Sequence, residues 1–393
     1  MTHGRTLDLE DVVIVGAGET DLGVVVDRGP MELGAESVQK AVKDAGLNLN
    51  QIDGLITCNS LVHPVMYHAE ATAEYLGIEP WHCLAVGTGG GTTFTAIRYA
   101  AAAIQTGLAH TVVVAMADSM RSFMTRERAM VVQASSGHPL YEQPYGPSVP
   151  AYYALIARAH MDQYGTTEEQ FAEAMVSSRA WASMNPTAQY RELVSVGDVM
   201  ASKPIADPLK MLDCSIVSDG GAAIVLTSRE RAADMPNKPI SLLGYGEGHS
   251  YEHISQSKNL TQSAAVESGR LAYQEAGLTP ADIDIAQLYD CFSPALLIQL
   301  EDLGFCAKGE GGHFLQSGAT RPGGSLPVNT HGGMLSHCHP GNPGAMFGVT
   351  EAIAQFRGLA GPRQQANPRH ILLHAQGGIM SSHATLILSQ ESA

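Results

Sequence analysis

The sequence predicts an α/β fold made of two similar halves. Three observations indicate it: an internal repeat, an alternation of short apolar strands with helices, and a long helical stretch that interrupts the first half. Strands that alternate with helices form parallel-rich sheets covered by helices, because a right-handed crossover packs each helix back onto the sheet. The simplest arrangement is therefore two α/β halves packed face to face.

The internal repeat is clearest where a helix ends and a strand follows. The segment AVKDAGLNLNQIDGLIT, which begins at Ala41, aligns with AYQEAGLTPADIDIAQL, which begins at Ala272. Each segment predicts a helix ended by a glycine, a short loop and a buried strand. Downstream, a glycine-rich turn, the helix TAIRYAAAAIQTG and the strand HTVVVAMA correspond to HPGNPGAM, VTEAIAQFRG and RHILLHAQGG. The same module therefore occurs twice.

The two halves differ in one inserted region. The residues from about 121 to 204 are helical and irregular in pattern and contain no second copy of the repeat. We expect them to form a cap inserted in the first half. On this basis residues 1–235 form the first half and residues 236–393 the second.

The duplication also predicts a cleft between the halves. Each half has a central helix that follows a glycine turn, and the duplication places these helices antiparallel, with both N-termini at one cleft. Unpaired N–H groups and a positive partial charge at a helix N-terminus stabilise an anionic oxygen. In the first half the turn contains Gly87, Gly89, Gly90 and Gly91, which could also serve only to start the helix.

Composition excludes several classes of function. A net charge of −16 disfavours nucleic acid and anionic membranes as partners. No apolar run reaches the ~18 residues of a membrane span, and the start of the sequence has no basic segment or cleavage site. The six cysteines include no CxxC pair, which argues against a zinc ribbon and a disulfide scaffold. We therefore expect a cytoplasmic protein without membrane insertion.

Four stretches together resemble one family over nearly the whole chain. They are YGPSVPAYYALIARAHMDQYGTTEEQFA, VMASKPIADPLKMLDCSIVSDGGAAIVL, LYDCFSPALLIQLEDLGFCAKGEGGHF and LPVNTHGGMLSHCHPGNPGAM. They are similar to the thiolase superfamily and, within it, to the sterol-carrier-protein-type thiolases. The resemblance implies the thiolase fold, a five-layer αβαβα sandwich of two duplicated α/β halves with an inserted cap, and acyl-CoA thioesters as substrates.

Both cysteines of the family's chemistry are missing from this sequence. The acylated cysteine of a thiolase stands at the N-terminus of the helix after the glycine turn, a position that falls on Gly90 or, if the glycines are aligned, on Val86. The second cysteine precedes the glycine pair of the last strand turn, where this chain has LLHAQGG with His374 and Ala375. Neither position supplies a thiol.

Other residues of the family's site are kept or replaced. The histidine of the family's Gly-His-Pro motif is kept as His339, with Cys338 in place of the glycine. The motif Asn-Glu-Ala-Phe or His-Asp-Cys-Phe of the family is Tyr-Asp-Cys-Phe here, so Tyr289 replaces the residue that holds the oxyanion. This tyrosine–aspartate pair resembles thiolase relatives that work with a small zinc-ribbon and OB-fold partner, among them aldolases that cleave steroid side chains. Those aldolases also lack the thiolase cysteines.

The resemblance and the residues together give a set of candidate site residues. For catalysis they are Tyr289, His339 and Asp290. For substrate binding they are Gly90, Gly91, His331, Gly333 and Cys338. Three of them also have a purely structural interpretation: Tyr289 as a core tyrosine, Asp290 as the N-cap of SPALLIQLEDLG, and His331 as part of a surface or interface loop.

A metal site is an alternative for the second motif. His331, His337, Cys338 and His339 would suit zinc by residue type. The Gly-Gly and Pro-Gly turns between them are also what an acyl-CoA site needs. We therefore expect no metal and no bound cofactor, with a coenzyme A thioester as the substrate.

The remaining groups suit aldol chemistry. Without a nucleophilic thiol, an acyl-enzyme has no carrier. In a retro-aldol reaction the proton of a β-hydroxyl is removed, the Cα–Cβ bond breaks and the thioester becomes an enolate. We expect Tyr289, with Asp290 nearby, to move this proton, and His339 with backbone N–H groups to hold the enolate oxygen. A base near neutral pH requires a neighbour that tunes Tyr289, and the sequence does not identify it.

Two other functions and one assembly remain open. The chain could be an acyltransferase in which Cys83, Cys291 or Cys338 has become the nucleophile, or a non-catalytic subunit that binds acyl-CoA. The resemblance implies a homodimer, in which the strand HTVVVAMADS continues a sheet across the two-fold axis. It also implies that a small zinc-ribbon and OB-fold partner joins this dimer in a heterotetramer.

Overall fold

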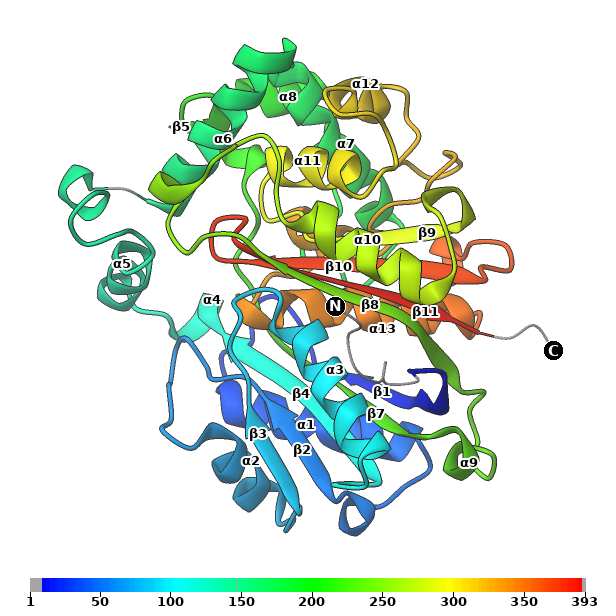
Figure 1. The fold of residues 1–393 in the computed structure, drawn as a ribbon. Helices are drawn as coiled ribbons and strands as arrows, with labels where there is room; N and C mark the ends of the chain where they lie inside the picture. The colour runs from blue at the N-terminus through cyan, green and yellow to red at the C-terminus, as the bar shows by residue number, and fades with distance from the viewer. Residues whose placement is uncertain (1–8, 147, 391–393) are drawn as a thin grey trace, which may run out of the picture.

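The computed structural model describes residues 9–146 and 148–390. Nine strands join in one continuous sheet with the strand order β3-β2-β4-β7-β1-β8-β11-β10-β9. Strands of the first half form one side of this sheet and strands of the second half form the other (Figure 1). The strands are β1 Val12–Glu19, β2 Gly54–Thr57, β3 His82–Ala85, β4 Thr111–Ser119, β7 Asp219–Ser228, β8 Ile240–His249, β9 Ile285–Leu288, β10 His370–Gly377 and β11 Ser382–Ser389.

Both halves repeat one pairing pattern. In the first half β2 is parallel to β4, β4 is antiparallel to β7, and β7 is antiparallel to β1. In the second half β9 is parallel to β10, β10 is antiparallel to β11, and β11 is antiparallel to β8. The predicted duplication is therefore confirmed. The first half adds the edge strand β3, which is parallel to β2.

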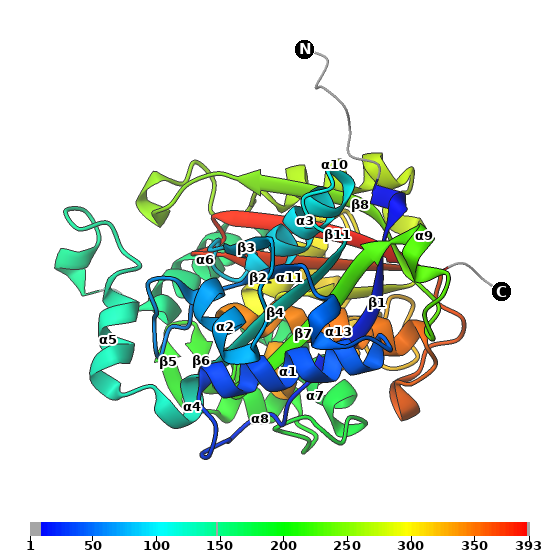
Figure 2. The same ribbon diagram turned by 90° about the horizontal axis from the view of Figure 1, so that it is seen from below.

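Helices cover both faces of each half. The main helices are α1 Pro30–Asp44, α2 His68–Leu76, α3 Thr92–Gln105, α10 Ala265–Ala276, α11 Ser293–Asp302 and α13 Met346–Phe356. Helices α3 and α13 form the central layer, because each contacts strands of both halves. Along β1, Val13 and Val15 pack with α1 on one face while Ile14 packs with α3 on the other. With α10 outside the second half, this is the predicted five-layer order (Figures 1 and 2).

The two halves also touch at one sheet edge. Strands β1 and β8 pair only at Val13↔Ser241 and Ile14↔Ile240. The sequence predicted halves packed face to face and did not predict this connection. The short pairing satisfies backbone groups of two strands that would otherwise be sheet edges.

The inserted cap lies between β4 and β7. It contains α4 Met120–Phe123, α5 Arg126–Ala134, α6 Val149–Tyr164, α7 Glu168–Ser183, α8 Val196–Ala201, and the small strands β5 Pro204–Ala206 and β6 Leu209–Lys210. Helix α7 contacts α11, α12 (Gly311–Gln316) and the π-helical stretch Gly333–His337. Helix α5 lies at the periphery of the molecule in both views (Figures 1 and 2), where its Arg128 donates to the Leu61 carbonyl oxygen.

The prediction that the strand HTVVVAMADS continues the sheet into a second subunit is wrong. Strand β4 is interior, as its apolar sequence predicted, but both of its edges are already paired, with β2 and β7. A strand with two partners cannot accept a third. The outermost strand of the first half is β3, so any continuation of the sheet on this side runs through β3. Within the described residues, no helix combines the length and apolar content that a bilayer span requires.

Candidate active site

The glycine turn before α3 has no room for a side chain at Gly90. A Cβ atom placed there would overlap the Gln376 carbonyl oxygen and the Tyr289 ring, and would lie 2.5 Å from the Tyr289 hydroxyl oxygen. Val86, the alternative position for the family's cysteine, instead continues the end of β3, where its N–H donates to Thr57. The structure therefore places Gly90, and not Val86, against Tyr289.

Tyr289 comes from the other half of the molecule, directly after β9. Its hydroxyl lies 3.3 Å from Nε2 of His339. The two rings meet edge to face, with centroids 5.9 Å apart and planes at 88°. The structure thus brings together the two residues that the sequence proposed for catalysis, with His339 as a hydrogen-bonding neighbour of the Tyr289 hydroxyl.

Two serines hold His339 in place. Ser215 Oγ lies 2.9 Å from the ring Nδ1, and Ser218 Oγ accepts a hydrogen bond of 3.0 Å from the His339 backbone N–H. Both serines lie in the run CSIVSDGG, between the cap and β7. Sequence reasoning quoted this run for its resemblance but did not assign Ser215 a role. Two serines in a loop that leads into a buried strand were the available signal.

Both members of the tyrosine–histidine pair are uncharged near neutral pH. Burial raises the pKa of Tyr289 well above its ordinary value. Burial also lowers the pKa of His339 to about 4, despite an opposing hydrogen bond from the ring to the Ile216 backbone. A buried site that disfavours charge keeps the phenol protonated and the imidazole neutral.

Asp290 does not start the helix that follows it. Helix α11 has Phe292 at its N-cap and no side-chain cap, so the predicted capping role is wrong. The Asp290 carboxylate instead accepts hydrogen bonds from the backbone N–H groups of Met334 at 2.7 Å and Leu335 at 3.4 Å. Burial raises the pKa of Asp290 to about 6, although the Met334 N–H opposes this. Asp290 therefore anchors the π-helical stretch that leads to His339.

The anchored stretch needs glycine at one position. Gly333 has φ +61°, and a Cβ atom there would lie within 2.7 Å of the Asp290 Cγ. Only a residue without a side chain fits this conformation against the carboxylate. Gly333 thus supports the site through Asp290. Gly91 is the N-cap residue of α3 and stands beside Gly90 in the turn.

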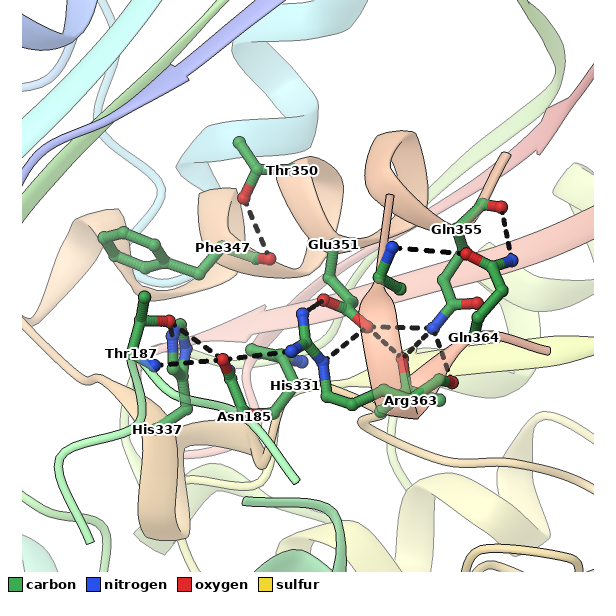
Figure 3. Close-up of polar contacts among 12 residues, drawn as sticks. Asn185, Thr187, His331, His337, Phe347, Thr350, Glu351, Gln355, Arg363 and Gln364 are labelled. Carbon is green, nitrogen blue, oxygen red and sulfur yellow. Dashed lines mark hydrogen bonds and ion pairs between the residues drawn. The ribbon is translucent and has the colours of Figure 1, made fainter. Parts of the chain in front are cut away.

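His331 is a buried residue, so its assignment to a surface loop is wrong. Its ring meets the His337 ring edge to face at 5.0 Å, and burial lowers its pKa to about 3. Its backbone oxygen accepts a hydrogen bond from Asn185 of the cap. Asn185 in turn accepts from Arg363, which forms a buried ion pair of 2.8 Å with Glu351 of α13 (Figure 3). This network fixes the loop between the cap and the central layer.

The residues of the metal alternative do not converge. His337 approaches Thr187, whereas His339 faces Tyr289 and Ser215. Cys338 Sγ points to the Asp219 backbone oxygen at 3.9 Å. Among the described residues, no three side chains of the histidine, cysteine, aspartate or glutamate type are grouped to hold a metal ion.

The cysteines proposed as relocated nucleophiles have thiols that resist ionisation. Burial raises the pKa of Cys83 to about 11 and that of Cys291 to about 12. It raises the pKa of Cys338 well above the ordinary value. A thiolate is the reactive form of cysteine, so none of these environments is that of an activated nucleophile.

The residues at the position of the family's second cysteine make contacts within the sheet. His374 in β10 bonds through Nδ1 to Thr385 at 2.8 Å and through Nε2 to His383 at 3.0 Å. Ala375 is fully buried. A Cβ atom at Gly89 would lie 2.8 Å from the Cα of Gly377, so the two glycine turns touch. The turns of both halves therefore meet at the site, but neither carries a thiol.

A small cavity lies beside this pair. It is lined by Phe94 from the first turn of α3, by Ala345 just before α13, and by Tyr289, Asp290 and His331. Both central helices thus begin at one site, as predicted from the duplication. The cavity has a volume of about 10 Å³, which is room for about one water molecule.

Models of known families match both halves of the chain. The thiolase N-terminal domain matches residues 12–230, and the thiolase C-terminal domain-like family matches residues 246–390. These matches agree with the duplicated sheets and with the five-layer arrangement.

Individual relatives are similar over almost their whole length. The chain is 37% identical over 383 residues to 17-hydroxy-3-oxo-4-pregnene-20-carboxyl-CoA lyase of Mycobacterium tuberculosis, covering 94% of this chain and 97% of the lyase. It is 35% identical over 382 residues to the steroid side-chain-cleaving aldolase of Thermomonospora curvata, covering 94% and 96%. A solved structure described as Ltp2-ChsH2(DUF35) aldolase superposes with a TM-score of 0.88 at 33% identity, covering 99% and 100%. The chain therefore belongs to the thiolase family and, within it, is of the sterol-carrier-protein type.

Proposed function

We propose that this chain is an aldolase that cleaves the Cα–Cβ bond of a β-hydroxyacyl-CoA by a retro-aldol reaction. The observation that carries the proposal is the exchange at Gly90, where the Tyr289 ring fills the space that a nucleophilic side chain would need. An acyl-enzyme has no carrier at this turn. A phenol in contact with a neutral imidazole is instead suited to moving a proton.

The proposed reaction uses the three candidate catalytic residues in different ways. Tyr289 takes the proton of the β-hydroxyl, and the electrons of the Cα–Cβ bond move into the thioester. Backbone N–H groups at the start of α3 hold the resulting enolate oxygen, an interaction worth ~3 kcal/mol per well-placed donor. His339 acts on Tyr289, because its Nε2 faces the phenol. Asp290 keeps His339 in position through the Met334 and Leu335 N–H groups.

The substrate in this proposal is a coenzyme A thioester, with no bound cofactor. The names of two relatives support a thioester that carries a steroid side chain, since one is a steroid side-chain-cleaving aldolase and the other a pregnene-20-carboxyl-CoA lyase. Retro-aldol cleavage of such a substrate yields a ketone and a shorter acyl-CoA.

The acyltransferase and the non-catalytic subunit are the competing functions. The raised pKa values of Cys291 and Cys338 weigh against the first, because an acyl-enzyme requires a thiolate. The contact between Tyr289 and His339 weighs against the second, because a subunit that only binds acyl-CoA has no use for a buried proton-transfer pair.

We propose a homodimer that pairs through the edge strand β3. The chain's outermost strand on this side is only half-buried, and Trp81 just before it is 80% exposed. A zinc-ribbon and OB-fold protein would join the dimer in a heterotetramer. The DUF35 component named with the similar solved structure supports the presence of a partner protein. We place the assembly in the cytoplasm, since all six cysteines of the chain are free thiols.

The function is tested by supplying the purified chain, alone and with a DUF35 partner, with a panel of β-hydroxyacyl-CoA thioesters that includes a 17-hydroxy-steroid-20-carboxyl-CoA. The expected products are a ketone or aldehyde and a shortened acyl-CoA, detected by mass spectrometry. An acyl-enzyme in the intact mass would instead identify an acyltransferase. Binding of the thioesters without any product would identify the non-catalytic subunit.

A further inference from the structure

A hydrogen-bonded line leads from the reactive phenol to a serine that the sequence did not single out. It runs from the Tyr289 hydroxyl to His339 Nε2 at 3.3 Å, and from His339 Nδ1 to Ser215 Oγ at 2.9 Å. Both ring nitrogens of the histidine are therefore engaged by hydroxyl groups. A neutral imidazole with a hydroxyl at each nitrogen can accept a proton at one while releasing a proton at the other.

Burial prevents either ring from storing the proton. A proton taken from the substrate would leave a charged imidazolium if it stopped at His339, and burial has lowered the pKa of this residue to about 4. Loss of the phenol proton without replacement would leave a buried phenolate, which burial also disfavours. Concerted transfer of protons along the line Tyr289–His339–Ser215 avoids a buried charge on either ring.

Ser215 is placed to end this line. It is half-buried, whereas Tyr289 is 7% exposed. Its backbone is fixed by a hydrogen bond of 2.9 Å from its N–H to the Cys291 carbonyl oxygen. Within the part of the chain that the structure describes, the Ser215 hydroxyl makes no hydrogen bond other than the one to His339. The hydroxyl therefore has a second hydrogen-bonding position that no described residue fills, in a side chain that is only half-buried.

We propose that Ser215 is the outer member of a proton relay that carries the β-hydroxyl proton from Tyr289 through His339 to solvent. This proposal rests on the proposed aldolase function. The substrate O–H bond breaks as a new O–H bond forms on Tyr289, while the phenol proton moves to His339 Nε2. In the same movement the Nδ1 proton passes to Ser215 Oγ, and the serine proton passes to water. The enolate is later protonated at Cα, which balances the proton released.

The relay is tested with Ser215→Ala in single-turnover cleavage of an accepted β-hydroxyacyl-CoA. We expect the rate to fall by about a hundredfold, at the lower end of the contribution of proton-transfer groups. In mixtures of H2O and D2O, the wild-type rate should depend on deuterium content along a curve, because several protons move together. With Ser215→Ala the curve should flatten toward a line. Ser215→Thr keeps a hydroxyl and should restore both the rate and the curvature.

A matched control is Ser202→Ala. Ser202 is also a half-buried serine of the same segment, but its hydroxyl donates to the Val199 carbonyl oxygen and has no contact with His339. Its removal should leave the rate and the curvature unchanged.

Three results would overturn the relay. The first is a wild-type rate in Ser215→Ala. The second is a slower Ser215→Ala enzyme with unchanged curvature, which would mean that the serine only holds the His339 ring in position. The third is a folded Ser215→Thr variant that recovers neither the rate nor the curvature. A wild-type chain that cleaves no β-hydroxyacyl-CoA, with or without the DUF35 partner, would overturn the proposed function and the relay with it. An active wild type with an unaffected Ser215→Ala overturns the relay alone.

Discussion

The two duplicated halves contribute different things to one site. The first half presents backbone only, since Gly90 and Gly91 stand before α3 without side chains. The second half presents Tyr289 and His339, which contact each other. The first half therefore contributes a turn without side chains, and the second half contributes the side chain that occupies the space beside this turn.

The largest expected effect is at the side chain of the second half. Tyr289→Phe removes one oxygen and keeps the ring that packs against Gly90, so kcat should fall by a factor of about 10²–10⁴ while acyl-CoA affinity stays nearly constant. Steady-state kinetics and thioester binding are the two measurements. Tyr273→Phe is the control, because it removes a buried hydroxyl that donates only to Leu303. Wild-type turnover in Tyr289→Phe would show that the Tyr-Asp-Cys-Phe motif is a structural turn without a catalytic role.

A side chain added to the glycine turn of the first half should displace Tyr289 of the second half and lower the rate. In Gly90→Ala the new Cβ overlaps the Tyr289 ring and the Gln376 carbonyl oxygen, so the phenol must move away from His339. A displacement of this kind costs on the order of 10²-fold in rate. Gly87→Ala changes the same turn where a Cβ meets nothing within 4 Å, so it should keep its activity.

Gly90→Cys extends the same comparison. It should lose aldolase activity without gaining thiolysis, because Tyr289 occupies the space of the thiol and the second family cysteine is absent. An acyl-enzyme in Gly90→Cys would show that the space is available after all.

As the pH falls, the second half should lose stability before the first half does. Burial holds the pKa values of His331, His339 and His383 at about 3 to 4, below the ordinary 6.5. Unfolding raises these pKa values, so the unfolded chain binds more protons between pH 6.5 and 4, and stability is present above this window and lost as the pH falls through it. Hydrogen exchange at pH 5 should therefore increase first around β10, β11 and the loop before α13. Earlier loosening of β2 and β4 would contradict this.

The smallest effect is expected at the cysteines. Single Cys83→Ser, Cys291→Ser and Cys338→Ser variants should keep most of the turnover once losses of stability are taken into account, because none of these thiols is activated. A loss of more than about a thousandfold in one folded variant would indicate a nucleophile. Melting temperatures measured in parallel separate the two causes.

The sequence alone was sufficient for the fold, and it proposed the two residues that meet at the candidate site. Glycine C-caps and apolar runs recur at a constant spacing, so the duplication could be read from Gly46 and Gly277 without a structure. The missing thiols were equally visible, because the absence of a residue type needs no coordinates. Motif position then identified Tyr289 and His339, which the structure brings within 3.3 Å of each other.

Only the tertiary structure decided what each polar group contacts. Asp290 looked like a helix cap because it precedes an apolar helix, yet its carboxylate bonds to amides more than forty residues later in the chain. For Ser215 the local signal, a serine in a loop before a buried strand, did not reveal its partner, since His339 is 124 residues away. The free edge at β3 likewise depends on which strands pair, and not on how apolar β4 is. Local patterns determine secondary structure and burial, because those depend on neighbours along the chain, whereas hydrogen-bond partners and the space beside Gly90 are set by segments that meet only in the folded molecule.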